Sequence, residues 1–291
     1  MNGKNTIKEV APCKVNLFLD ITGKRADGYH GIESVMATLG ICDEVTVEKT
    51  DDGISVRMES DGGLSDDLET LPEEKNLAYK AAKIFLQAAK LEGAGVRISI
   101  IKRIPSRAGL GGGSADAAAV LRGMNRLFGS PFSEEELQRL GLTLGADVPF
   151  CVSGGFALCR GIGEEITKID SKITFHGVII SENAEKKSTA EAYAAADRAM
   201  CSLKKRADGA VNMASFLEAG DFDAALGEAY NVFAEAGIYP DGARELLSSL
   251  GARYVVMSGS GPSVAAYVET EDEAARLFDE LTARGIKALR F

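Results

Sequence analysis

The most informative segment of the chain reads Ile104-Pro105-Ser106-Arg107-Ala108-Gly109-Leu110-Gly111-Gly112-Gly113-Ser114-Ala115-Asp116. Four of the five residues from 109 to 113 are glycines, so few side chains block a ligand and unusual backbone angles are permitted. Apolar residues follow at helical spacing, which predicts a helix that begins at this turn: Ala117, Val120, Leu121, Met124, Leu127 and Phe128. Because the first amides of a helix are unpaired and carry the positive end of its dipole, the segment predicts an anion-binding turn.

Other glycine-rich motifs fit this segment poorly. A P-loop requires a lysine after its glycines, and none follows here. The dinucleotide-binding fingerprint requires a glycine where Ser114 stands. The H-R-D and D-F-G motifs of protein kinases are absent from the sequence. A tight turn that only lets a strand pack against a helix remains the alternative.

The bulk composition is that of a globular protein with an acidic surface. The chain has 291 residues, of which 45% are hydrophobic and 26% charged, and its formal net charge is -10. This charge repels a polyanion on average, so nucleic acid is not an expected partner. A phosphate-bearing ligand therefore needs a local positive site.

The cysteines and the apolar segments favour a cytoplasmic protein. The five cysteines are odd in number, widely spaced and without a C-x-x-C pair, which is typical of reduced thiols. The first apolar run contains Lys14 and lacks the core of a signal peptide. No uncharged stretch approaches the ~18 apolar residues needed to span a bilayer, so no membrane partner is expected.

Strands and helices are mixed without strict alternation, which predicts an α+β fold. Alternating residues predict strands over 7–21, 41–49, 53–59 and 96–100, and a strand-turn-strand over 253–269. Helical spacing covers 76–91, and capping boxes are predicted at Ser133 with Glu136 and at Ser188 with Glu191. The acidic stretch 61–75 is expected to be a loop. A boundary near residue 158 divides the chain into predicted domains 1–158 and 159–291.

Three more segments accompany the glycine turn. They are Ala11-Pro12-Cys13-Lys14-Val15-Asn16-Leu17 followed by Gly23-Lys24-Arg25-Ala26-Asp27-Gly28-Tyr29-His30, then Leu144-Gly145-Ala146-Asp147-Val148-Pro149-Phe150, then Met257-Ser258-Gly259-Ser260-Gly261-Pro262-Ser263. In this order they resemble the GHMP small-molecule kinases, from Ala11 to Val264. The combination of GLGGGS with GADVPF resembles a branch that phosphorylates a cytidine-diphosphate-linked alcohol. The resemblance implies a two-domain fold, with an N-terminal ATP-binding domain like ribosomal protein S5 domain 2 and an α/β C-terminal substrate domain.

The resemblance implies phosphoryl transfer from ATP with Mg²⁺, and it assigns the catalytic roles to Asp147 and Lys14. Asp147 would orient or deprotonate the attacking hydroxyl, and Pro149 is expected to keep Val148 out of a helix. Lys14 would pair with Asp147 and stabilise charge on the transferred group. From the residues alone, Asp147 reads as a helix cap or loop residue, and Lys14 as a solvent-facing member of an amphipathic strand.

The family's nucleotide-binding positions fall on the glycine turn and two outlying residues. Asn76 would lie near the adenine and Lys102 near the phosphates or the ribose, although a lysine that ends a strand is commonly only solvated. Ser114, the last of the turn, would meet Mg²⁺ or phosphate oxygens. The positions implied for ATP are Asn76, Lys102, Pro105, Ala108, Gly109, Leu110, Gly111, Gly112, Gly113 and Ser114.

The family's acceptor positions centre on the DGYH segment. Tyr29 and Tyr193 would stack on the two faces of a cytosine, and His30 would hydrogen-bond to its edge, since stacking alone tolerates any base. The remaining positions are Asn16 for the alcohol, Gly259 and Gly261 for the phosphates, and Thr189. Without the resemblance, Gly-Tyr-His reads as a surface loop, and His176 as structural.

Departures from the family pattern leave alternatives open. Arg107 stands where a small residue is usual, Ala115 where serine is frequent, and Asn231-Val232-Phe233 replaces Asn-Asp/Glu-Leu. A kinase for another alcohol, such as mevalonate, homoserine or a sugar, is one alternative, and a silent nucleotide-binding protein is another. DGYH argues against the former, and the intact Lys14 and Asp147 against the latter. A monomer or weak homodimer is expected.

Overall fold

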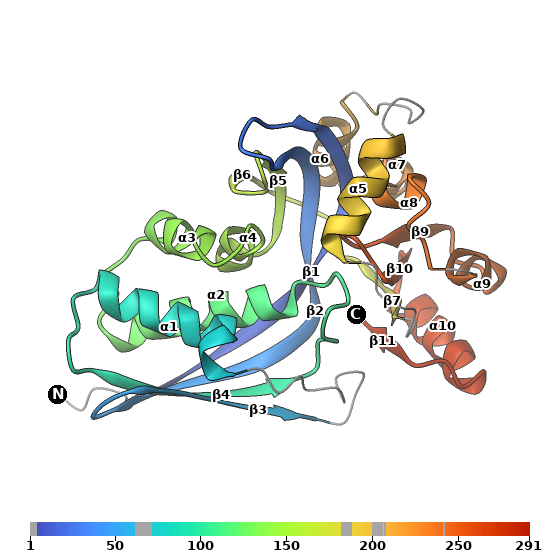
Figure 1. Ribbon diagram of the computed structural model, residues 1–291. Helices are drawn as coiled ribbons and strands as arrows, with labels where there is room; N and C mark the ends of the chain where they lie inside the picture. Colours follow the sequence, from blue (N-terminus) through green and yellow to red (C-terminus); the bar gives the residue numbers. More distant parts are fainter. Residues whose placement is uncertain (1–4, 62–71, 182–187, 200–205, 207, 241) are drawn as a thin grey trace. The chain divides into compact units, whose positions relative to one another are not determined.

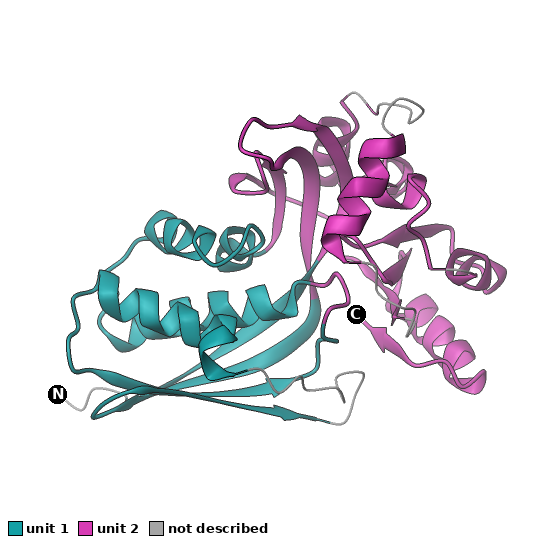
Figure 2. Cartoon of the chain, in the orientation of Figure 1, with its two compact units in different colours: residues 1–14, 40–106, 111–154 teal, residues 15–39, 107–110, 155–291 magenta. Residues whose placement is uncertain are grey.

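The computed structural model describes residues 5–61, 72–181, 188–199, 206, 208–240 and 242–291 (Figure 1). Its contacts divide the chain into two compact units (Figure 2). Unit 1 comprises residues 1–14, 40–106 and 111–154, and unit 2 comprises 15–39, 107–110 and 155–291. The chain crosses from unit 1 to unit 2 for the last time between residues 154 and 155, near the predicted boundary at 158. The two predicted domains remain a proposal.

Unit 1 contains four hydrogen-bonded strand segments in the order β3-β4-β2-β1. The strands are β1 (Thr6–Lys24) and β2 (His30–Thr50), each of which continues into unit 2, together with β3 (Ile54–Ser60) and β4 (Gly95–Lys102). β4 runs antiparallel to β2 and parallel to β3. Val96, Ile98 and Ile100 are buried while the residues that follow each of them are exposed, which confirms the predicted alternation.

The helices of unit 1 are α1 (Leu77–Ala88), α2 (Gly112–Leu127), α3 (Glu134–Leu142) and α4 (Val148–Ser153), after a short 3₁₀ turn η1 (Glu73–Lys75). α1 and α2 lie side by side on one face of the sheet segment (Figure 1). The capping box of Ser133 and Glu136 is confirmed at the start of α3. Most of the predicted loop 61–75 lies outside the described residues.

The strands of unit 2 belong to two groups. The first contains the remaining parts of β1 and β2 with β5 (Phe156–Arg160), β6 (Glu165–Ile169) and β8 (Tyr230–Asn231). The second is an antiparallel sheet in the order β11-β7-β10-β9, made of β7 (His176–Ser181), β9 (Tyr254–Met257), β10 (Ser263–Val268) and β11 (Ala288–Arg290). The predicted strand-turn-strand is thus the hairpin of β9 and β10, with Met257 opposite Val264.

The helices of unit 2 are α5 (Thr189–Ala199), α6 (Gly209–Ala219), α7 (Phe222–Gly227), α8 (Val232–Glu235), α9 (Ala243–Ser249) and α10 (Glu271–Ala283). α10 packs on β7, β10 and β11, while α9 packs on β9 and β10. The predicted capping box at Ser188 is present, because Ser188 and Glu191 exchange side-chain to backbone hydrogen bonds. The mixture of helices and sheets confirms the α+β class. No helix within the described ranges has the length and apolar character needed to cross a membrane.

Candidate active site

Lys14 and Asp147 form an ion pair within unit 1. The ammonium nitrogen of Lys14 lies 3.3 Å from Oδ2 of Asp147. Lys14 is only 4% exposed, because β1 is buried on both faces at this point, so it is not a solvated residue of an amphipathic strand. A buried lysine needs a partner for its charge, and Asp147 supplies one.

Asp147 occupies the N-cap position of α4 but does not use its side chain as a cap. Its carboxylate pairs with Lys14 and stays 35% exposed, so it has both a cation beside it and access from outside. The expectation for Val148 is wrong, since Val148 is the first residue of α4 and Pro149 the second. Proline is tolerated there because the amides of the first helical turn have no partner within the helix.

The glycine turn meets Lys14 where α2 begins. Gly111 is the N-cap of α2 and has a left-handed backbone (φ 68°). A β-carbon on Gly111 would lie 2.8 Å from Cγ of Lys14, so the aliphatic stem of the lysine passes against this glycine. Unit 1 therefore brings together an uncapped helix N-terminus, a buried ammonium and an accessible carboxylate. This combination is suited to binding a phosphate and to orienting a hydroxyl toward it.

The earlier part of the turn is held by the β9–β10 hairpin within unit 2. Gly109 has φ 79°, and a β-carbon there would lie 2.5 Å from the carbonyl oxygen of Ser258. Ser258 Oγ donates to the carbonyl of Gly109 at 2.9 Å, and the amide of Ser263 donates to the carbonyl of Ala108 at 3.1 Å. Only glycine fits so close a backbone approach at position 109. Ala108 and Gly109 are thus brought together with the hairpin turn, while their predicted contacts with ligands stay predictions.

Asn16 joins the same hairpin. Its Oδ1 accepts from the amide of Gly259 at 3.1 Å, and its Nδ2 donates to Ser34 Oγ at 2.8 Å. Nδ2 of Asn231 donates to the carbonyls of Met257 and Gly259, at 2.7 and 2.9 Å. In the sequence, Asn231 was noted only as part of a motif that departs from the family pattern. In the structure, its hydrogen bonds hold the shape of the turn that is predicted to contact phosphates. Ser34 lies outside every motif found in the sequence, whereas Ser258 belongs to the motif of residues 257–263 but was given no role of its own.

His30 has a carboxylate and an aromatic partner within unit 2. Its Nε2 lies 2.8 Å from Oδ1 of Asp197, and the hydrogen bond to His30 lowers the pKa of that carboxyl. A carboxylate can only accept, so Nε2 carries a proton and Nδ1 is the remaining ring nitrogen. The His30 ring stacks on Tyr193 at 4.7 Å between centroids, and Phe233 meets Tyr193 edge-on at 4.9 Å.

The other residues that are expected to bind the acceptor substrate also lie in unit 2. Tyr29 is 62% exposed at the end of a turn, and Thr189 Oγ1 lies 3.5 Å from Ser260 Oγ in the hairpin turn. His30 begins β2 and is not in a surface loop. Tyr193 stacks on His30 in this structure. Its stacking on a cytosine base stays a prediction. Asp197 lies four residues after Tyr193 on α5, so the two side chains share one face of this helix. This spacing is the one feature of the sequence that could have pointed to Asp197.

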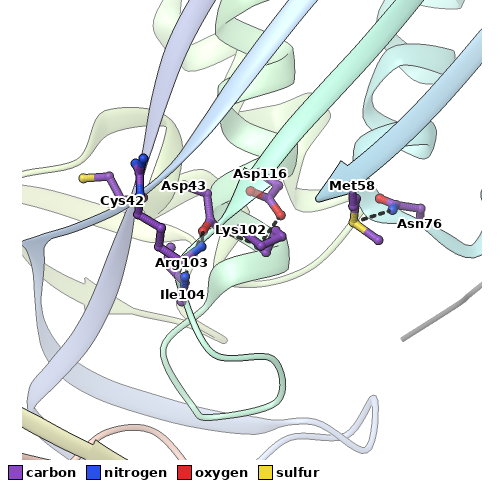
Figure 3. A network of polar contacts seen from close by, with 8 residues as sticks. All are labelled: Cys42, Asp43, Met58, Asn76, Lys102, Arg103, Ile104 and Asp116. Carbon is purple, nitrogen blue, oxygen red and sulfur yellow. Dashed lines mark hydrogen bonds and ion pairs between the residues drawn. The ribbon is translucent and has the colours of Figure 1, made fainter. Parts of the chain in front are cut away.

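Lys102 lies in a buried ion cluster of unit 1 (Figure 3). Its ammonium contacts the carboxylates of Asp43, which lies outside every motif found in the sequence, and of Asp116, which ends the glycine-rich segment but was given no role there. Asn76 caps α1 by accepting from the amide of Ala78 at 2.8 Å, and its Nδ2 lies 3.4 Å from Met58 Sδ. Over the described ranges, no group of three or more histidine, cysteine and acidic side chains is placed to hold a metal ion.

Comparison with known proteins identifies the family of the chain. Residues 76–155 match the family model of the GHMP kinases N terminal domain, and residues 213–287 match that of the GHMP kinases C terminal domain. The solved structure of a homoserine kinase from Cytophaga hutchinsonii shares the fold, with a TM-score of 0.72 at 20% identity, over 100% of this chain and 95% of that one. The chain belongs to the GHMP kinases, a class of phosphotransferases.

The most similar relatives fall in one branch of that class. A 4-diphosphocytidyl-2-C-methyl-D-erythritol kinase from Acetivibrio thermocellus is 40% identical over 277 residues, 93% of each chain. The same enzyme from Bacillus velezensis is 37% identical over 279 residues, 94% of this chain and 92% of the relative. A crystal structure of a 4-(cytidine 5'-diphospho)-2C-methyl-D-erythritol kinase has a TM-score of 0.74 at 30% identity and covers 98% of both chains. Within the GHMP kinases, the chain therefore belongs to the family of these relatives.

Proposed function

We propose that this kinase transfers the γ-phosphate of Mg-ATP to the 2-hydroxyl of 4-diphosphocytidyl-2-C-methyl-D-erythritol, which gives the 2-phosphate and ADP. The observation that carries the proposal is the pairing of Lys14 with Asp147 against Gly111, at the N-terminus of α2. The relatives at 35–40% identity carry the name of this activity. The expected cytoplasmic location and a monomeric or weakly dimeric state belong to the same proposal.

The chemistry assigned to these residues is positioning and charge stabilisation. The amides at the start of α2 bind phosphate oxygens, and the Lys14 ammonium offsets charge on the transferred group. Asp147 accepts the hydroxyl proton as the new oxygen–phosphorus bond forms and the bond to the leaving ADP oxygen breaks. Mg²⁺ bound with ATP would neutralise phosphate charge. Ser114, half-buried in the first turn of α2, has a hydroxyl whose oxygen suits that ion or whose proton can be donated to a phosphate oxygen.

The direct test is ADP release by purified protein with Mg-ATP and this acceptor. A parallel panel with mevalonate, homoserine and sugars separates the proposal from a kinase with another substrate. We expect turnover with the cytidyl compound and background rates with the others. Background ADP release with the cytidyl compound would refute the assignment, and turnover of a panel member would name the replacement.

His30 is expected to select the cytosine base. With Nε2 donating to Asp197, Nδ1 is the ring nitrogen left for the base, and as an acceptor it would suit the amino group of cytosine and not the O4 atom of uracil. We predict that His30→Ala raises KM for the cytidyl acceptor about threefold to tenfold, the effect of one hydrogen bond, while KM for ATP stays unchanged. Steady-state kinetics with each substrate varied measures both constants.

Two further variants sharpen this prediction. His176→Ala removes the other histidine, which begins β7, and should leave both KM values unchanged. Asp197→Ala removes the carboxylate that keeps a proton on Nε2 of His30, so either ring nitrogen can then carry it. This variant should therefore reduce the preference for CMP over UMP as competitive inhibitors. If His30→Ala weakened ATP and acceptor equally, the residue would support the fold rather than recognise the base.

A further inference from the structure

A buried ion cluster joins residues of β2, β4 and α2 (Figure 3). Lys102 ends β4 and places its ammonium between the carboxylates of Asp43 on β2 and Asp116 on α2. Its Nζ lies 2.6 Å from Oδ2 of Asp116, and it contacts Oδ2 of Asp43. The three residues are 5%, 0% and 4% exposed. A β-carbon on Gly112 would lie 3.6 Å from Nζ of Lys102, so the cluster reaches the glycine turn from inside unit 1.

The cluster fixes the chain on both sides of that turn. Oδ1 of Asp43 accepts from the amides of Arg103 at 2.5 Å and Ile104 at 2.8 Å, which holds the backbone as it leaves β4. Asp116 holds the second turn of α2 to the same ammonium. Ile104 packs against Gly112, where a β-carbon would lie 3.0 Å from Cγ2 of Ile104. The cluster therefore ties two strands, β2 and β4, to the start of α2.

The charge of Lys102 is already satisfied within the cluster. Burial alone would lower the pKa of Lys102, but Asp116 and Asp43 outweigh it and the pKa is raised, so the ammonium keeps its proton. Burial raises the pKa of Asp116 to about 7, against the attraction of Lys102. Oδ1 of Asp116 has no hydrogen-bond partner among the described residues and is the atom that can carry this proton.

We propose that Asp43, Lys102 and Asp116 are a positioning cluster for the glycine turn, and that Lys102 supports ATP binding through Ile104 and Gly112 rather than by contact with the phosphates. The inference rests on the proposed function, since it takes ATP to bind at the turn. Lys102 thus has an indirect role, in place of the position near the phosphates or the ribose that the family resemblance implied. A buried charge is costly to leave without its partner, so loss of one member should disturb the others.

Charge rescue separates the two roles of Lys102. Lys102→Met leaves two buried carboxyl groups without their cation and should weaken ATP binding about 100-fold by displacing the turn. Adding Asp116→Asn removes one of them, while Asp43 keeps its amide donors, so the double variant should recover at least about tenfold. A lysine that contacted ATP directly would give no recovery. Calorimetric titration with Mg-ATP measures binding without turnover, and Lys80→Met on the exposed face of α1 is the matched lysine control.

A second measurement keeps the test decisive if Lys102→Met does not fold. The charged groups around Asp116 are Lys102 and Asp43, while Lys80 and Lys83 of α1 and the Arg103–Glu44–Asp61 group are more exposed. As the pH rises through about 7, Asp116 loses its proton and the cluster becomes more negative. KM for ATP should then rise more from pH 6 to pH 8 in wild-type protein than in Asp116→Asn.

Each outcome has a defined meaning. Recovery in the double variant, or a flatter pH profile in Asp116→Asn, supports the positioning role. A folded double variant as weak as Lys102→Met overturns it, as does a pH profile that Asp116→Asn leaves unchanged. Wild-type protein that binds no ATP would instead overturn the proposed function, and the inference with it.

Discussion

Asp147→Asn is expected to lower kcat by about 10²–10⁴-fold, the range for loss of a general base, with little change in KM for either substrate. Asparagine keeps the size of the side chain but cannot accept the hydroxyl proton. The position suits this role because the carboxylate is 35% exposed, lies 3.3 Å from Lys14 and makes no helix-capping bond. Initial rates of ADP release at saturating substrates give kcat, and the variant's thermal midpoint checks folding.

The control for this variant is Asp170→Asn, which changes the same chemical group on an exposed residue after β6. It should retain the wild-type rate. Activity of Asp147→Asn within about threefold of wild type would remove Asp147 from the mechanism. An equal loss in both variants would point to an effect of net charge.

Gly111→Ala is expected to reduce kcat/KM for ATP by about 100-fold, because small displacements of reacting groups have effects of this size. The added methyl group faces two obstacles. The left-handed backbone of Gly111 costs about 1–2 kcal/mol for any other residue. The β-carbon would also lie 2.8 Å from Cγ of Lys14, whose buried stem has little room to move. The ammonium should shift away from Asp147 as a result.

Gly129→Ala separates these two causes. Gly129 follows α2 with φ 86°, but a β-carbon there would have no atom within 4 Å. It therefore has the backbone cost without the collision, and should lower the thermal midpoint while leaving kcat/KM for ATP near wild type. If both variants lost activity equally, contact between Lys14 and the turn would not matter for catalysis.

The sequence predicted the elements that depend on local pattern. The glycine turn, the helix after it, the alternating β4 and the capping box of Ser133 all have short-range signals, and the structure confirms them. The first part of β2 was missed because residues 34–37 are buried on both faces, so no alternation marks the strand. The pairing of Lys14 with Asp147 was expected from the family resemblance, not from spacing.

The supporting residues could not be found in the same way. Asp43 and Asp116 are isolated aspartates, 59 and 14 positions from Lys102, and nothing local indicates that they share one ammonium. Asp197 is 167 positions from His30. Residues 15–39 are grouped with unit 2 although they lie early in the chain, which a single boundary in the sequence cannot represent. Such long-range contacts arise from folding topology and not from sequence pattern.

A crystal structure with a non-hydrolysable ATP analogue and the cytidyl acceptor tests the central claim most directly. We predict the triphosphate on the amides of Gly111 to Ser114, with the acceptor's 2-hydroxyl in hydrogen-bonding distance of Asp147 and facing the γ-phosphorus. A nucleotide bound away from this turn, or an acceptor hydroxyl turned away from Asp147, would contradict the account.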